Sequence, residues 1–153
     1  MTHEDEDLLT SRRKAMAVLA AAKATELQQA VAGLRDLGAI KELKPPEIGL
    51  VMLRGRIGSD GTTFNVGEAT VARAIVQLPS GEIGYGMRLG RDLRAARNAA
   101  ILDALWQAPA SRPQMAATVL SPISRRLAAD RARKSAEAAA SRVDFFTLAR
   151  EST

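Results

Sequence analysis

The chain has 153 residues, of which 46% are hydrophobic and only 3% aromatic, and a formal net charge of +5. This length is typical of a single domain, residues 1–153, whose core must consist of aliphatic side chains and methionine. Because cysteine is absent and His3 is the only histidine, the sequence offers no Ser-His-Asp or Cys-His catalytic set, no zinc site and no disulfide, and we assign no catalytic or metal-binding residue.

The N-terminal part of the sequence predicts two helices. The acidic residues 1–10 (MTHEDEDLLT) are expected to be a frayed tail, and the alanine-rich segment from about Leu9 to Ala24 favours a helix. For the second helix, Thr25 and Gln28 have the spacing of a capping box. Apolar residues then recur with helical spacing at Leu27, Ala30, Val31 and Leu34. Gly38 is expected to end this helix as a left-handed C-cap.

The middle third predicts an antiparallel sheet. Nine of the 11 glycines lie between Gly49 and Gly90, and Pro45–Pro46 excludes a helix and begins an extended segment. The expected strands are IGLVMLRGRIG, EATVARAIVQL and EIGYGMRL. Turns are indicated at Asp60-Gly61 and at residues 79–81 (PSG), so the last two strands should form a hairpin.

The stretch GEIGYGMRLGRD, residues 81–92, has glycines ahead of an expected helix, as phosphate-binding loops do. A dinucleotide-binding pattern requires glycine at position 89, where Leu89 stands, and a crossover connection rather than a hairpin. Glycines at alternate strand positions favour instead the close approach of another backbone or a helix. We therefore expect Gly84 and Gly86 to serve packing, and we also name them as candidates for a partner contact.

The C-terminal third predicts helices. Asp92 is expected to cap a helix from Leu93 to about Gln107, whose two apolar stripes indicate that it is sandwiched between the sheet and another layer. Prolines at positions 109 and 113 should end that helix, and Ser121-Pro122 should begin the last one. Beyond Leu127 the apolar positions of the last helix are nearly all alanine, so it requires support from a neighbour. The fold class is thus α+β, with N-terminal helices, a central antiparallel sheet of three or more strands and C-terminal helices.

Two groups of residues are candidates for binding. Near the start of the helix at Leu93, four arginines could contact an anion, although a solvated basic rim explains them equally well; they are Arg88, Arg91, Arg94 and Arg97. Near the C-terminus, two adjacent phenylalanines cannot share one helix face and so invite a protein partner. The candidate interface there comprises Arg142, Val143, Asp144, Phe145 and Phe146.

The sequence shows no signal for export or membrane insertion. It has no run of about 18 apolar residues, and its acidic start is unlike a secretory or transit signal. We therefore expect a cytoplasmic protein that does not bind a membrane. An isoelectric point of about 10.2 indicates either an anionic partner or only a soluble basic surface.

Three ordered segments resemble one known family. GEATVARAIVQLPSGEIGYGMRLGRD, AAILDAL and ASRVDFFTLAR are similar to PhnG, a subunit of the bacterial carbon–phosphorus lyase complex of phosphonate metabolism and organophosphorus catabolism. The resemblance runs from about Met16 to Arg150. It implies a cytoplasmic subunit of a transferase, which acts with PhnH, PhnI and PhnL to move the ribose triphosphate of ATP onto methylphosphonate and release adenine.

The resemblance also implies a hetero-oligomer that includes the radical subunit PhnJ. The chemistry is attributed mainly to PhnI, and the family has no assigned catalytic motif in PhnG, so it supplies no catalytic residue for this chain. We therefore expect no cofactor bound by the chain itself, with Mg-ATP as the substrate of the complex.

Two other functions remain as alternatives. A basic nucleic-acid-binding or assembly module fits the charge, but the sequence has no aromatic stacking platform, zinc finger or recognisable recognition helix. We accordingly expect no nucleic-acid partner. A stand-alone phosphate-ester enzyme is disfavoured because the required general bases are missing.

Overall fold

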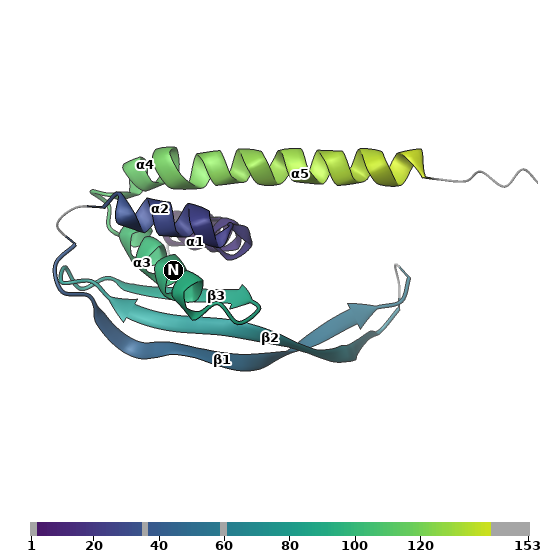
Figure 1. Cartoon of the computed structure of the whole chain (residues 1–153), viewed down its shortest axis with the longest axis horizontal. Coiled ribbons are helices and arrows are strands. Elements are labelled where there is room, and N and C mark those ends of the chain that lie inside the picture. The colour runs from purple at the N-terminus through teal and green to yellow at the C-terminus, as the bar shows by residue number, and fades with distance from the viewer. Residues whose placement is uncertain (1–2, 35–36, 59–60, 142–153) are drawn as a thin grey trace, which may run out of the picture.

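The computed structural model describes residues 3–34, 37–58 and 61–141, with side chains from residue 6 onward. It confirms an α+β fold, in which N-terminal helices precede an antiparallel sheet and C-terminal helices follow it. Figure 1 shows the layers: helix α3 lies on the sheet, α1 and α2 lie above α3, and the C-terminal helices lie above those.

The described residues form a three-stranded sheet with the order β1-β2-β3. Strand β1 (Lys41–Arg56) pairs antiparallel with β2 (Thr63–Gln77), which pairs antiparallel with β3 (Ile83–Leu89). Pro45 and Pro46 lie inside β1, where the register with β2 shifts between Lys44 and Glu47. The sheet tolerates both prolines because β1 is an edge strand, whose outward N–H groups have no strand to pair with. The predicted turn residue Asp60 lies outside the described residues.

Close packing explains the glycines of β3, as predicted. A Cβ atom at Gly84 would lie 2.6 Å from the backbone nitrogen of Ala104, and one at Gly86 would lie 2.7 Å from that of Ala100. Helix α3 (Leu93–Gln107) therefore sits directly on this face of β3, closer than any larger residue would allow. Both glycines are buried, so the chain's own helix occupies the face that we named as a candidate partner contact.

Helix α3 has the predicted bounds and the predicted cap. The Asp92 carboxylate accepts a hydrogen bond from the backbone N–H of Ala95 at 2.9 Å. One side of α3, with Ala100 and Ile101, packs on Ala74 and Val76 of β2. The other side packs against the remaining helices through Ala95, Ala99, Leu102 and Trp106. The expected sandwich is confirmed.

The N-terminal helices differ from the prediction at their ends. Helix α1 (His3–Ala21) begins within the acidic stretch, and α2 (Ala24–Ala32) begins after Lys23, whose N–H donates to the Glu26 carboxylate at 2.7 Å. Glu26 is an acceptor for this orphan N–H, so Thr25 and Gln28 do not form the predicted capping box. Gly38 does have a positive φ of 64°. However, α2 ends six residues earlier, at Ala32, so Gly38 is not its C-cap.

The C-terminal elements form one continuous helical rod. Helix α4 (Arg112–Met115) leads into a π-helical turn, η1 (Ala116–Leu120), and then into α5 (Ser121–Ala140). The last α-helix does begin at Ser121, as predicted, but Ser121 is not an N-cap, because its own backbone is helical and continues the rod from η1. Ser121 N–H donates to the carbonyl of Ala116, five residues back. This widened turn accommodates Pro122, whose ring has no N–H and would clash with a carbonyl in a regular α-helix.

Candidate functional site

The four candidate arginines do not form one cluster. Arg88 is on the helix-facing side of β3, where its guanidinium donates to the carbonyl of Leu19 at 2.6 Å and to that of Ala22. Burial lowers the pKa of Arg88, yet a guanidinium stays charged in proteins, so it serves as a fixed cap on the last carbonyls of α1. Arg97 pairs with Glu42 of β1 at 2.6 Å. The guanidinium groups of both arginines are thus engaged by other parts of the chain. The prediction that all four arginines form one anion-binding group is therefore wrong for Arg88 and Arg97.

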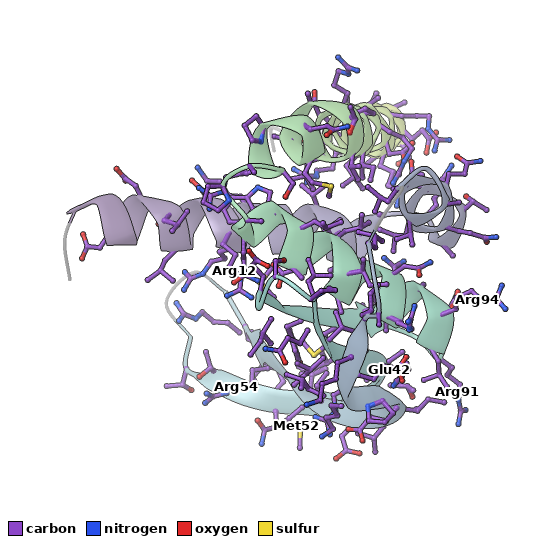
Figure 2. All side chains as sticks on the ribbon, turned by 90° about the vertical axis from the view of Figure 1, so that its left-hand side faces the viewer. Arg12, Glu42, Met52, Arg54, Arg91 and Arg94 are labelled. Atoms are coloured by element: carbon purple, nitrogen blue, oxygen red, sulfur yellow. The ribbon has the colours of Figure 1, made fainter. Side chains whose placement is uncertain are left out.

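Arg91 and Arg94 remain available. Both are exposed, and neither makes an ion pair with any other residue that the structure describes. In Figure 2 they lie on the same side of the molecule as Glu42 and on the opposite side from Arg54. Their guanidinium groups are free to bind an anion on this side of the molecule, the role that the sequence suggested for all four arginines.

An open pocket of about 600 Å³ lies beside Arg94, between α2, α3 and β1. Asn98 is only 6% exposed, and its side chain makes no hydrogen bond within the described ranges. The pocket is lined by Gln28, Val31, Ala32, Pro46, Leu93, Arg94, Arg97 and Asn98. This lining can hold an acidic or amide-bearing group against an apolar wall, but it has no general base or nucleophile.

The most deeply buried charge belongs to a structural network. Asp103 of α3 is fully buried, and its carboxylate accepts from the Arg12 Nη2 atom at 2.7 Å and from the Tyr85 N–H at 2.9 Å. A third donor is the Gln107 amide at 3.3 Å. The hydrogen bond between Arg12 and the Asp103 carboxylate raises the pKa of Arg12. Because Asp103 is enclosed and satisfied by α1, α3 and β3, it fastens layers together and does not face a substrate.

A second feature is an apolar ribbon that projects from the sheet, which we call the arm. It comprises residues 50–56 of β1 and 63–70 of β2, beyond the point where Leu89 ends β3 opposite Val71. Apart from the half-buried Val51, its large apolar side chains are exposed: Leu50 by 62%, Met52 by 54%, Leu53 by 45%, Phe64 by 43% and Val66 by 62%. Ile57, just past the arm, is 76% exposed. Such a concentration of exposed apolar side chains is typical of a protein-binding surface.

Helix α5 also projects from the body of the molecule. Ile123 is its buried residue, and residues 131–141 are all exposed. Figure 1 shows α5 and the arm extending on the same side, beyond the other elements. For residues 131–140 of this alanine-rich helix, the predicted neighbour is thus not found among the residues that the structure describes.

Other kinds of site find little support. Across the described residues, no three His, Cys, Asp or Glu side chains gather closely enough to hold a metal ion. Nor does any helix there combine the length and apolar character needed to cross a membrane. The predicted interface residues Arg142, Val143, Asp144, Phe145 and Phe146 lie outside the described ranges.

The arm was missed by the sequence analysis, although a signal was present. The third predicted strand, EIGYGMRL, is shorter than the first two, IGLVMLRGRIG and EATVARAIVQL, so part of the hairpin had to extend past it. Asn98 was missed because it lies between Arg97 and Ala99 in a largely apolar helix and carries no motif of its own.

Comparison with known proteins agrees with the resemblance seen in the sequence. The family model described as phosphonate metabolism protein PhnG matches residues 10–151. A protein of Rhizobium meliloti (strain 1021), alpha-D-ribose 1-methylphosphonate 5-triphosphate synthase subunit PhnG, is 46% identical over 146 residues, which cover 95% of this chain and 93% of that protein. With nearly full-length matches to both, the chain belongs to the PhnG family of phosphonate metabolism proteins.

Proposed function

We propose that this chain is an accessory core subunit of an alpha-D-ribose 1-methylphosphonate 5-triphosphate synthase. The complex transfers the ribose triphosphate of ATP to methylphosphonate and releases adenine. The chain acts there with PhnH-, PhnI- and PhnL-like subunits, and next to a PhnJ-like subunit of the carbon–phosphorus lyase system. The name of the Rhizobium meliloti relative, a synthase subunit, supports this role.

One observation carries the accessory assignment: the described residues present unpartnered protein surface but no set of reacting groups. The buried carboxylate of Asp103 is fully engaged in hydrogen bonds, and Arg88 is bound to backbone carbonyls. By contrast, the arm and α5 project from the body with their side chains exposed. A subunit that works through contacts with neighbours has this distribution, whereas an independent enzyme requires a pocket with a base or nucleophile.

In this proposal the chain itself binds no cofactor, and Mg-ATP is the substrate of the assembled synthase. The candidate segment from Arg142 to Phe146 contributes to a hetero-oligomeric interface that begins on α5. Two adjacent phenylalanines supply the apolar contact, while Arg142 and Asp144 fix its register through polar contacts.

Co-purification from the native host tests the proposed function. The full chain carries an affinity tag, the proteins that elute with it are identified by mass, and the eluate from lysate without nuclease treatment is also assayed for nucleic acid. We expect a fixed set of PhnH-, PhnI- and PhnL-like subunits to elute with the chain in a constant ratio. Recovery of nucleic acid in place of such proteins, or of the chain alone, contradicts the proposal.

A further inference from the structure

We propose that the arm inserts into an apolar groove, rimmed by carboxylates, on another subunit of the synthase. This inference rests on the proposed function, because it takes the partner to be a different subunit of that complex. It adds which part of the chain enters the partner and what chemistry the partner's groove must have.

The arm is apolar on both of its faces. Successive strand residues point to opposite sides of a sheet, so Leu50 and Met52 lie on one face of β1 while Leu53 lies on the other. All three are between 45% and 62% exposed. A flat partner surface would cover one face and leave the other in water. The partner must therefore enclose the arm from two sides, as a groove does.

The arm also lacks support within its own chain. The paired residues run from Leu50↔Thr70 to Arg56↔Thr63, and β3 contributes no pairing beyond Val71. A two-stranded ribbon is at best marginally stable in water, and it gains stability from a third strand or from packing against another element. The body supports only the base of the arm, where the Gly90 N–H donates to the Thr70 carbonyl at 2.9 Å. For the rest of this ribbon a partner subunit is the natural source of both.

The free edge of β1, on the side away from β2, limits where a strand of the partner can pair. Pro45 and Pro46 have no N–H group to donate, so they block strand addition next to the body. From Leu50 to Arg56 every residue has an N–H, and the outward-pointing ones face no strand in the described part of the chain. The longest stretch of β1 edge open to strand addition thus lies beyond the prolines and includes the arm.

The charge of the arm excludes a second copy of the chain as the preferred occupant. Arg54 donates to the Thr63 hydroxyl at 3.4 Å, and neither Arg54 nor Arg56 pairs with a carboxylate of the described residues. The arm's acidic residue is Glu68. Two arms packed together would bring like charges into contact, whereas carboxylates at the rim of a groove would meet both arginines.

A set of polar substitutions tests the apolar contact. Leu50→Thr and Val66→Thr are combined in the full tagged chain, because threonine keeps a high strand propensity and both positions are 62% exposed. We expect an unchanged thermal midpoint for the isolated chain and at least about tenfold less partner protein recovered in co-purification, as each apolar contact contributes to binding. The matched control is Leu8→Gln with Leu9→Gln on α1, where exposed leucines are also removed and recovery should stay constant.

A charge reversal tests the carboxylate rim. Arg54→Glu with Arg56→Glu should reduce recovery most at low salt, while Arg13→Glu with Lys14→Glu on α1 makes the same change of charge and should have little effect. If the unaltered chain recovers its partners and both arm variants do so equally well, the arm proposal is overturned and the proposed function stands. If the unaltered chain recovers no partner, the proposed function fails and the arm proposal fails with it.

Discussion

Arg12 and Asp103 are 91 residues apart in the sequence, yet the Arg12 Nη2 and Asp103 Oδ2 atoms lie 2.7 Å apart. Their ion pair joins α1 to α3, and the same carboxylate holds the N–H of Tyr85 in β3. In Figure 2 Arg12 reaches from α1 to the junction with α3. Three elements from distant parts of the chain are thus fastened at one buried point.

Removal of the arginine from this pair should destabilise the protein strongly. Arg12→Met leaves the fully buried Asp103 carboxylate without its counter-charge, which typically costs about 3–5 kcal/mol. Asp103→Asn in the same chain removes the uncompensated charge, so the double variant should be more stable than Arg12→Met alone. Urea unfolding followed by circular dichroism measures both. Equal stability of Arg12→Met and the unaltered chain would show that the pair is not buried as described.

Substitution of Gly86 should be far more harmful than substitution of another strand glycine. Gly86→Val forces a side chain into the backbone of α3, so overpacking should cost at least about 1–3 kcal/mol. Gly49→Ala is the matched control in β1, because its Cβ would meet atoms of the Arg73 side chain at an ordinary 3.7 Å. Thermal melts of the two variants give the comparison. A Gly86→Val chain that melts normally but loses ATP binding would support the phosphate-loop alternative instead.

Stability should fall at acidic pH partly through Glu26. Hydrogen bonds from Arg126 at 2.6 and 2.9 Å, and from the Lys23 N–H, lower the pKa of Glu26 below its ordinary value. A carboxylate whose pKa is lower in the folded state contributes stability that is complete above the unfolded-state pKa of about 4.3 and is lost as the pH falls through the folded-state value. Glu26→Gln should therefore flatten the dependence of unfolding on pH in this range, measured by urea midpoints from pH 6 to pH 2. If the urea midpoint of Glu26→Gln falls with pH as steeply as that of the unaltered chain, other carboxylates cause the loss of stability in acid.

Truncation after Ala140 should separate folding from assembly. The last part of α5, residues 131–140, is exposed, and the helix packs on the body through Ile123 and Leu127 nearer its start. We expect the truncated chain to keep the circular dichroism and melting midpoint of the full chain but to co-purify poorly with a PhnI-like partner. Two buried phenylalanines would contribute about 3–6 kcal/mol to such an interface. If the truncated chain unfolds, the phenylalanines belong to its own core. If it binds undiminished, the interface lies elsewhere.

The parts of the fold that could be predicted are those with local causes. Asp92 caps the helix that follows it, and the alternating Gly84 and Gly86 mark the face on which that helix packs. Each of these signals lies within a few residues of the structure it specifies, so one sequence suffices to read it.

Apart from the ends of the N-terminal helices, the main errors concern contacts between distant segments. Arg88 was grouped with Arg91 because they are neighbours in sequence, but strand alternation puts it on the same face as Gly86, where α1 supplies its partners. The Arg12–Asp103 pair has no local pattern, apart from an acidic residue in the middle of an apolar helix. The sequence also marked the start of the last α-helix at Ser121 but gave no signal for the widened turn that joins this helix to α4.

Reconstitution of the synthase tests the central claim most directly, that the chain is required in the complex but supplies no reacting group of its own. Purified subunits are incubated with Mg-ATP and methylphosphonate, and adenine release is measured with the chain alone, with the other subunits alone and with all of them together. We predict no adenine from the chain alone, little from the others without it, and turnover only when the chain is added back. Adenine release by the purified chain alone, or undiminished release in its absence, would contradict the account.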